Sequence, residues 1–352
     1  MFSTKNTSSV VGLDVEAGSV AAIELRGNGS PSVVRTAIGD LPPGAVDDGE
    51  VVDAEALSVA LRALFSEHKL PKQVRLGVAN QRVAVRMMHL PLIEDPDELE
   101  TAVRFQAQDE LPMPLDQAVL DYQVVSKQTN DDGERRMDVV AVGARRDMLE
   151  GLTTAIRGAG LKPVGIDLSA FAMIRALAHE GEGGGEPETT LYCHLGDVTN
   201  LAVAHGDACL FTRISPFGLE SVAGKLAERR ELPLDEARRQ LVVVGLGGDA
   251  SAGLDELETT AARDALTDGA AKLVGELRMS LDYYGAQDAV PAVERLVLCG
   301  PGSTIPGLAD HLEDALAYRV DELRPTALAG LEDHEAARLT VSYGLALEEA
   351  VA

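Results

Sequence analysis

Two short polar turns, about half a chain apart, carry residue types that can bind a phosphate group. The first lies in Val10–Leu25, VVGLDVEAGSVAAIEL, and the second in Leu191–Ala204, LYCHLGDVTNLAVA. Each segment is typical of a strand, a tight turn with a glycine, and a second strand that begins near a hydroxyl residue. Backbone N–H groups and hydroxyls are donors that bind phosphate oxygens. The sequence therefore predicts two anion-binding turns.

The two segments align without a gap when Asp14 is set on His194, and Ser19 then matches Thr199. A glycine in each turn favours a tight reversal of the chain. A third strand and then an amphipathic helix are expected after each pair of strands, so the pattern indicates a duplicated unit. The turn glycines are Gly18 and Gly196, and the third strands are Val33–Ile38 and Ala208–Ile214.

A duplicated unit of three strands and a helix, with facing hydroxyl-bearing turns, is how the actin, sugar-kinase and Hsp70 class holds a nucleotide. The predicted fold class is therefore α/β, with two actin-like (ribonuclease H-like) βββαβα lobes. The alternative is a pair of unrelated β-hairpins that are similar only in composition.

The composition limits the possible partners. The 352-residue chain has a formal net charge of −26. This charge would repel a nucleic-acid backbone, and it disfavours adsorption to an anionic membrane. Aromatic residues make up 3% of the chain, too few to build base-stacking platforms. No apolar run has the length of a membrane span and residues 1–9 lack a signal-peptide core, so a cytoplasmic protein is expected.

The cysteines do not suggest a metal site. Cys193, Cys209 and Cys299 lie far apart in predicted buried strands, without a CxxC pair or a His at metal-binding spacing. A free Cys in such a strand behaves as a small hydrophobic residue, which fits a reducing compartment. No catalytic residue is predicted.

A compact α/β subdomain is expected within the first half, over residues 74–159. The helix before it should begin after Asp53, a good N-cap. Two prolines in Leu111–Pro114 prevent the expected helix Asp95–Glu110 from continuing. The expected strands are Val74–Val78, Val83–Leu90, Ala118–Val125, Met137–Ala144 and Val164–Leu168. The expected helices are Asp95–Glu110 and Arg145–Ala159, with a turn at Asn130–Glu134.

A Gly-rich acidic stretch, 181–188, reads as the clearest linker of the chain. Beyond it, a buried strand runs directly into Gly300–Ser303 and then a helix from Gly307, a context that lets backbone approach a ligand closely. The other elements expected in this half are helices at Glu220–Arg230, Leu234–Val243, Leu257–Tyr284 and Glu335–Glu349, the strand Val293–Cys299 and a Gly-rich turn at Gly245–Gly253.

Several stretches, in order along most of the chain, resemble the actin-like PilM family of type IV pilus assembly, which is related to the cell-division protein FtsA. The most specific are AVRFQAQDELPMPLDQAVLDYQVV at Ala102–Val125 and GLKPVGIDLSAFAMIRAL at Gly160–Leu177. Further matches are LFTRISPFG at Leu210–Gly218, LRMSLDYY at Leu277–Tyr284, LVLCGPGSTIPGL at Leu296–Leu308 and VSYGLAL at Val341–Leu347.

The resemblance implies a bilobed actin-like fold with an FtsA-like inserted subdomain and ATP between the lobes. It also implies a cytoplasmic protein that is peripheral to the inner membrane through its partners. The implied parts are a first lobe at 1–73 and 160–187, the inserted subdomain at 74–159, and a second lobe at 188–334 with a helical part at 219–290. A C-terminal helix at 335–352 would pack on the first lobe. The nucleotide-binding positions would be Gly12, Asp14, Gly18, Ser19, Gly196, Thr199, Asn200, Gly300, Gly302 and Ser303.

The chain departs from the family pattern where ATP and Mg²⁺ would bind. Glu16 replaces a glycine of the first turn, and a carboxylate about 4 Å from a phosphate charge would oppose it by roughly 4 kcal/mol before screening. Ala21 replaces a lysine, and His194 replaces a carboxylate that would direct Mg²⁺. Arg238 and Leu241 stand where the family has the residues that bind the ribose and the adenine. ATP binding with Mg²⁺ is therefore expected to be weak.

The resemblance also implies a groove that captures the N-terminal tail of the inner-membrane protein PilN, and contacts with other pilus assembly components. The first hypothesis is a scaffold with a degenerate nucleotide site. The second is an ATP-dependent switch or slow ATPase, and a more remote one is a sugar-kinase relative. The groove residues would be Val83, Val85, Met87, Phe105, Gln108 and Met113.

Overall fold

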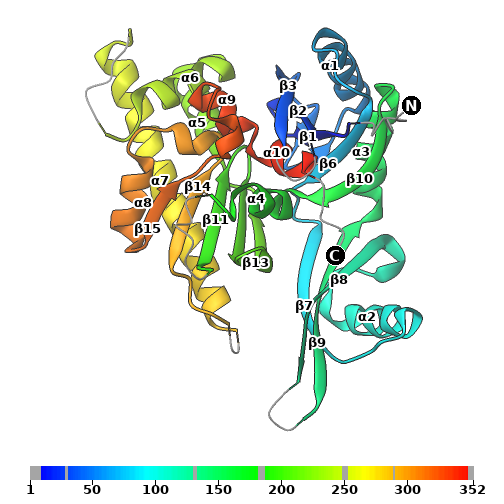
Figure 1. Cartoon of the computed structure of the whole chain (residues 1–352). Coiled ribbons are helices and arrows are strands. Elements are labelled where there is room, and N and C mark those ends of the chain that lie inside the picture. The colour runs from blue at the N-terminus through cyan, green and yellow to red at the C-terminus, as the bar shows by residue number, and fades with distance from the viewer. Residues whose placement is uncertain are drawn as a thin grey trace.

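A computed structural model describes the chain over residues 9–27, 31–129, 133–180, 187–247, 253–287 and 290–347. It contains two lobes, each built on a five-stranded sheet, and a smaller subdomain attached to the first lobe (Figure 1). Parts of the predicted turns at 130–134 and 245–253, most of the linker at 181–188, and residues 348–352 lie outside the described residues.

The first-lobe sheet has the strand order β10-β6-β1-β2-β3. β1 is antiparallel to β2 and parallel to β6, as a strand–hairpin–crossover unit requires. The first-lobe core lies between this sheet and two helices that contact each other. The elements are β1 Val11–Val15, β2 Ser19–Arg26, β3 Ser32–Asp40, β6 Gln73–Val78, β10 Lys162–Leu168, the helices α1 Ala54–Glu67 and α3 Arg146–Gly158, and a short hairpin of β4 Val46–Asp47 and β5 Glu50–Val51.

The second-lobe sheet repeats the first in the order β13-β12-β11-β14-β15, with the same antiparallel and parallel neighbours. This repetition confirms the duplicated unit and excludes the alternative of two unrelated hairpins. The elements are β11 Thr189–Leu195, β12 Thr199–His205, β13 Ala208–Ser215, β14 Arg295–Cys299 and β15 Arg319–Glu322, with α5 Leu219–Arg230, α6 Leu234–Val244, α7 Glu256–Gly285 and α8 Leu308–Leu316.

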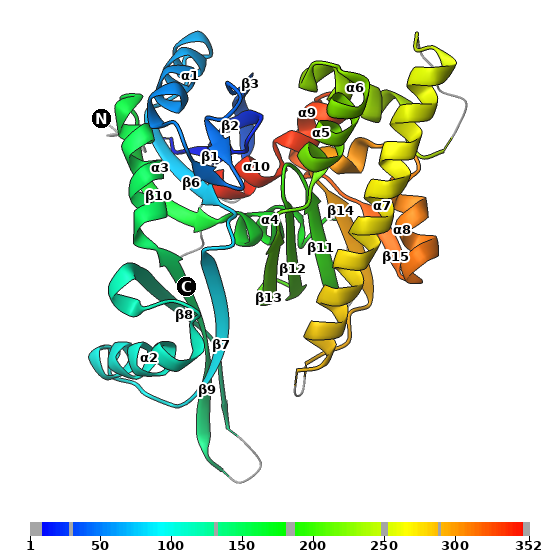
Figure 2. The same cartoon turned by 180° about the vertical axis from the view of Figure 1, so that it is seen from behind.

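The inserted subdomain is a three-stranded antiparallel sheet of order β7-β9-β8 with one helix packed on it (Figure 2). β7 is an edge strand on the side of the second lobe, where it contacts β13. Asp95 caps the helix by accepting the N–H groups of Asp97 and Glu98 at 3.0 Å. The elements are β7 Val83–Pro91, α2 Pro96–Glu110, β8 Ala118–Thr129 and β9 Arg135–Arg145.

The subdomain is smaller than the predicted range 74–159. β6 lies within that range but pairs with β1 and β10 of the first lobe. α3 also lies within it but packs against α1, and its Ala155 and Ile156 are fully buried in the first-lobe core. The sheet pairings thus assign only β7 to β9 to the insertion.

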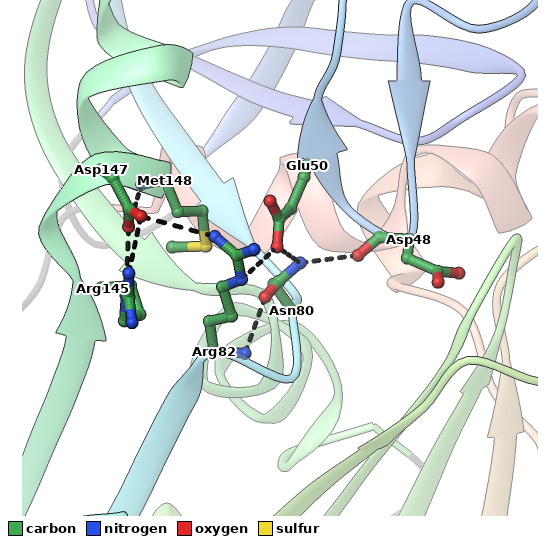
Figure 3. A network of polar contacts seen from close by, with 7 residues as sticks. All are labelled: Asp48, Glu50, Asn80, Arg82, Arg145, Asp147 and Met148. Carbon is green, nitrogen blue, oxygen red and sulfur yellow. Dashed lines mark hydrogen bonds and ion pairs between the residues drawn. The ribbon is translucent and has the colours of Figure 1, made fainter. Parts of the chain in front are cut away.

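A polar network joins the subdomain to the first lobe where the chain crosses between them (Figure 3). Arg82 Nε lies 2.8 Å from Glu50 Oε1, and its Nη1 lies 3.6 Å from Asp147 Oδ2. Asn80 accepts the backbone N–H of Arg82 at 2.7 Å. A two-pronged hydrogen bond from Arg145 holds the pKa of Asp147 down, at about 2. These contacts fix how the subdomain leaves the first lobe.

Two short helices stand where one helix was predicted over Glu335–Glu349. They are α9, Asp333–Arg338, and α10, Thr340–Ala346, separated at Leu339. α10 packs between β1 and α4, Ser169–Leu177, and so lies on the first lobe.

Glycines allow this close approach of backbone to backbone. A Cβ added at Gly12 in β1 would overlap the carbonyl oxygen of Ser342, and one added at Gly344 would overlap that of Ala172 in α4.

Gly12→Ala is expected to lower the free energy of unfolding by about 1–3 kcal/mol, because its methyl group meets helix backbone that must shift. Gly151→Ala is the control, since Gly151 lies in α3 with open space around its Cα. The control should raise stability by up to about 1 kcal/mol. Urea denaturation measures both, and equal stabilities of the two variants would rule out the packing role of Gly12.

Candidate functional site

The turns predicted to face each other do meet. The backbone N–H of Gly18 donates to Asp197 Oδ2 at 2.8 Å, a contact between residues 179 positions apart. Glu16 Oε1 lies 3.9 Å from His194 Nδ1. A Cβ added at Gly300 would lie 2.6 Å from the His194 ring, so the third glycine turn borders the same place. The three segments therefore converge between the lobes.

The strand pairing corrects the alignment of the two turns. Four residues, 16–19, lie between the paired residues Val15 and Val20, and three residues, 196–198, lie between the paired residues Leu195 and Thr199. The first turn is therefore one residue longer than the second. The strand residue that matches Thr199 is Val20, so the gapless match of Thr199 to Ser19 is wrong by one residue.

Two hydroxyls that were expected to bind phosphate are bonded to the chain itself. Thr199 Oγ1 donates to the carbonyl oxygen of Phe217 at 2.6 Å, where both groups are buried. Ser303 Oγ donates to the carbonyl oxygen of Gly300 at 2.9 Å. A hydroxyl has one proton to donate, so neither is left to donate to a phosphate oxygen.

The predicted glycines serve different purposes. Gly12 lies in a strand against α10, and Gly302 packs on the side chain of Leu195. Gly196 lies against the carboxylate of Glu16. Gly300 has a φ of +74°, which favours glycine, and leaves room for the His194 ring. Gly12 and Gly302 are therefore packing residues, and the others line the meeting point of the turns.

Three carboxyl groups lie at this meeting point: Asp14 is buried, and Glu16 and Asp197 are half-buried. Burial, together with the nearby Asp197, raises the pKa of Asp14 to about 7. Burial, with Asp197 and Asp14, raises the pKa of Glu16 well above its usual range. Burial also raises the pKa of Asp197. The same desolvation lowers the pKa of His194 to about 4, so its imidazole is neutral at pH 7.

Asp197 is the main residue that the sequence reasoning missed. It follows Gly196 directly, but the anion-binding turn was predicted from Gly196 and the hydroxyl of Thr199 alone. Arg238 makes a bidentate ion pair with Glu220 at 2.6 and 2.9 Å, and its guanidinium lies against Gly18. Leu241 is buried in the second-lobe core. Arg238 thus has two of its guanidinium nitrogens bonded to Glu220, and Leu241 has no polar side-chain atom to offer a nucleoside.

The described residues do not fit a nucleoside triphosphate with Mg²⁺. The amide of Gly18 already has an acceptor in Asp197 Oδ2, and the clustered carboxyl groups of Asp14, Glu16 and Asp197 supply no counter-charge for phosphate. One observation favours a ligand: Asn200 is buried and its amide N and O have no hydrogen-bond partner among the described residues. No cluster of three metal-ligating side chains occurs in the part of the chain that the structure describes.

The six residues predicted for a partner groove do not lie on one surface. Alternate residues of a strand point to opposite faces of the sheet. Val83 and Val85 pack against the first-lobe core, whereas Ala84 and Met88 face α2. Met113 borders the α2 core, whereas Phe105 is 72% exposed.

The exposed face of α2 bears a shallow hollow of about 480 Å³. Its floor includes Phe105, and the groups around it are mainly polar or charged. Arg104 Nη2 lies 3.3 Å from Glu100 Oε1, an exposed ion pair. The lining residues are Asp97, Glu100, Thr101, Arg104, Phe105 and Gln108.

Comparison with known proteins identifies the family. A family model described as type IV pilus assembly protein PilM matches residues 12–350. The chain belongs to the PilM family. Among solved structures, it matches one titled PilM-PilN type IV pilus biogenesis complex with a TM-score of 0.81 and 26% identity, over 96% of this chain and 97% of that chain.

Solved structures of other proteins, at lower identity, share only the fold with this chain. MreB5 of Spiroplasma citri bound to ADP matches with a TM-score of 0.57 and 14% identity, over 96% and 95% of the two chains. The ethanolamine utilization protein EutJ from Carboxydothermus hydrogenoformans matches with a TM-score of 0.56 and 15% identity, over 96% and 88%. The predicted actin-like fold class is confirmed. Within the described residues of this PilM-family chain, no helix is both long and apolar enough to cross a bilayer.

Glu16→Gln should change the pH dependence of stability. A carboxyl whose pKa is raised in the folded state contributes stability that is full below its unfolded pKa, about 4.5, and is lost as pH rises through the folded pKa. The amide cannot ionise, so at pH 8.5 the variant should be more stable than wild type by on the order of 1–2 kcal/mol. At pH 5 the difference should be small.

Urea denaturation at the two pH values makes this measurement. Glu67→Gln, at the exposed end of α1, is the control and should track wild type at both. A Glu16→Gln protein less stable than wild type at pH 8.5 would show that the carboxylate is not under electrostatic stress.

Proposed function

We propose that this chain is an actin-like scaffold of type IV pilus assembly that binds the N-terminal tail of a PilN-type inner-membrane protein. The observation that carries the proposal is the match to a PilM–PilN complex over nearly the whole of both chains, at 26% identity. The protein would be cytoplasmic and held at the inner membrane by this partner. It would thereby connect further cytoplasmic pilus components to the membrane.

The nucleotide site is proposed to be degenerate, so the scaffold would work without ATP hydrolysis. In support, the donors of Gly18, Thr199 and Ser303 are already bonded within the chain. The alternative is an ATP-dependent switch or slow ATPase of the same family. The orphaned amide of Asn200 favours that alternative, but a single amide does not offset buried carboxyl groups.

The tail is proposed to contact the exposed face of α2 through Phe105 and Gln108. An exposed Phe among charged neighbours is available to a partner, whereas Val83 and Val85 are already packed on the first lobe. The acidic rim, Asp97 and Glu100, fits a peptide with basic residues beside its apolar anchor.

Phe105→Ala should weaken tail binding by about tenfold or more, because aromatic anchors dominate such contacts. Fluorescence anisotropy with the cognate PilN-type N-terminal peptide and the full chain measures the affinity. Val59→Ala is the matched control, since Val59 is 55% exposed on α1. Met87→Ala tests the strand half of the predicted groove and should have little effect.

Raising the salt concentration should weaken the wild-type complex as well. If Phe105→Ala binds the peptide as wild type does and Met87→Ala does not bind it, the tail-binding site lies on β7 and not on α2. Absence of peptide binding by the wild-type chain would refute the proposed function.

Restoring the family residues should restore nucleotide affinity. Glu16→Gly with His194→Asp is expected to increase ATP·Mg²⁺ affinity by about tenfold or more, since one opposing charge is removed and one metal-directing carboxylate is added. Adding Asp197→Ala should increase it further by freeing the Gly18 amide. Isothermal titration calorimetry compares these proteins with wild type, and lower affinity in the double variant would contradict the assignment of the turns.

A further inference from the structure

The two lobes are connected at the turns by a hydrogen bond that places a carboxylate on a phosphate-type amide. Gly18 belongs to the first lobe and Asp197 to the second, and the N–H to Oδ2 distance is 2.8 Å. A turn with a free backbone N–H is a natural anion site. Here the anion is a side chain of the facing turn, so the amide is occupied without a ligand.

Other charged side chains lie close to this hydrogen bond. Gly196 lies against the Glu16 carboxylate, and the Arg238 guanidinium lies against Gly18 while it is held by Glu220. The charged or titratable groups that face Asp197 and Glu16 are Asp14 of β1, His194 of β11, Glu220 of α5, Arg238 of α6 and Arg338 of α9.

We propose that Asp197 is an intramolecular stand-in for a nucleotide phosphate, and that its bond to the Gly18 amide latches the two lobes closed in the absence of nucleotide. The inference rests on the proposed degenerate nucleotide site but not on tail binding. A relative with an empty anion site would need a ligand to bring its turns together, whereas this chain supplies the bridging group itself.

The latch responds to pH because closing it buries carboxyl groups. Separated lobes would expose Asp14, Glu16 and Asp197 to water, where their pKa values return to about 4. The closed state holds their protons more tightly, with the pKa of Asp14 at about 7. Protonation therefore favours closure fully below about pH 4, and this contribution is lost as pH rises through about 7. His194 acts in the opposite direction only where exposed imidazole is protonated, below about pH 6.5.

The test measures the distance between lobes in the full chain without nucleotide. Spin labels are placed at Glu55→Cys on α1 and Glu228→Cys on α5, both exposed. The native cysteines are buried, and burial raises their thiol pKa values, which protects them from labelling. Double electron–electron resonance then reports one distance distribution for closed lobes and a longer, broader one for open lobes.

Two substitutions at one position separate the hydrogen bond from the charge. Asp197→Ala removes the acceptor and should shift the distribution to longer distances at pH 7.0, with amide exchange at Gly18 faster by about tenfold. Asp197→Asn keeps an acceptor oxygen without a charge and should retain the closed distribution. Between pH 7.0 and 8.5, wild type should move toward the open distribution and Asp197→Asn should move less.

The matched control is Asp268→Ala on the exposed face of α7, which should behave as wild type. A wild-type distribution in Asp197→Ala would overturn the latch, and so would equal opening of Asp197→Ala and Asp197→Asn at pH 7.0. Tail binding is measured on the same samples. If Asp197→Ala keeps the wild-type distances while wild type binds the tail peptide, this inference alone is refuted. If wild type does not bind the tail peptide but Asp197→Ala opens the lobes, the proposed function alone is refuted.

Discussion

Three carboxyl groups gathered between two facing turns are the constraint on which the arrangement of those turns depends. The duplicated fold brings Asp14, Glu16 and Asp197 to one place, where burial raises the pKa of each. Ionising all of them together in a dry site is costly. The nearby amide of Gly18 and the guanidinium of Arg238 lie close to these groups and moderate this cost. Protons and internal donors thus take the place that a ligand and a metal would otherwise hold.

Close backbone packing holds the turns in position. α10 lies between β1 and α4, because Gly12 and Gly344 have no Cβ to keep the chains apart. β1 leads directly into the first turn, so the position of α10 is transmitted to Asp14 and Glu16. The second turn is held in the same way by Gly300 against His194.

The sequence predicted the lobes well, since their strands and helix caps carry strong local signals. Asp53 caps its helix as expected, and the predicted helix Asp95–Glu110 is present as α2, with Asp95 as its cap. α4 was not identified as an element, because it is buried nearly all round and has no polar stripe to mark a helical period. β15 was missed because it is a short edge strand with one neighbour.

The site was harder to predict, because its geometry depends on register and on the facing lobe. A gapless alignment compares residue types and cannot detect that one turn has an extra residue. Asp197 acts only through a partner 179 positions away. Phe105 is apolar yet exposed, because it lies two residues from the buried Val103 and so on the opposite side of the helix.

The central claim is that this PilM-family chain recruits its membrane partner without a nucleotide cycle. Its most direct test is a calorimetric titration of the full chain with the PilN-type N-terminal peptide, with and without ATP and Mg²⁺. The account predicts the same affinity in both conditions, since no nucleotide is needed to close the lobes. Peptide binding that requires ATP, or that strengthens by more than about tenfold on its addition, would contradict the account.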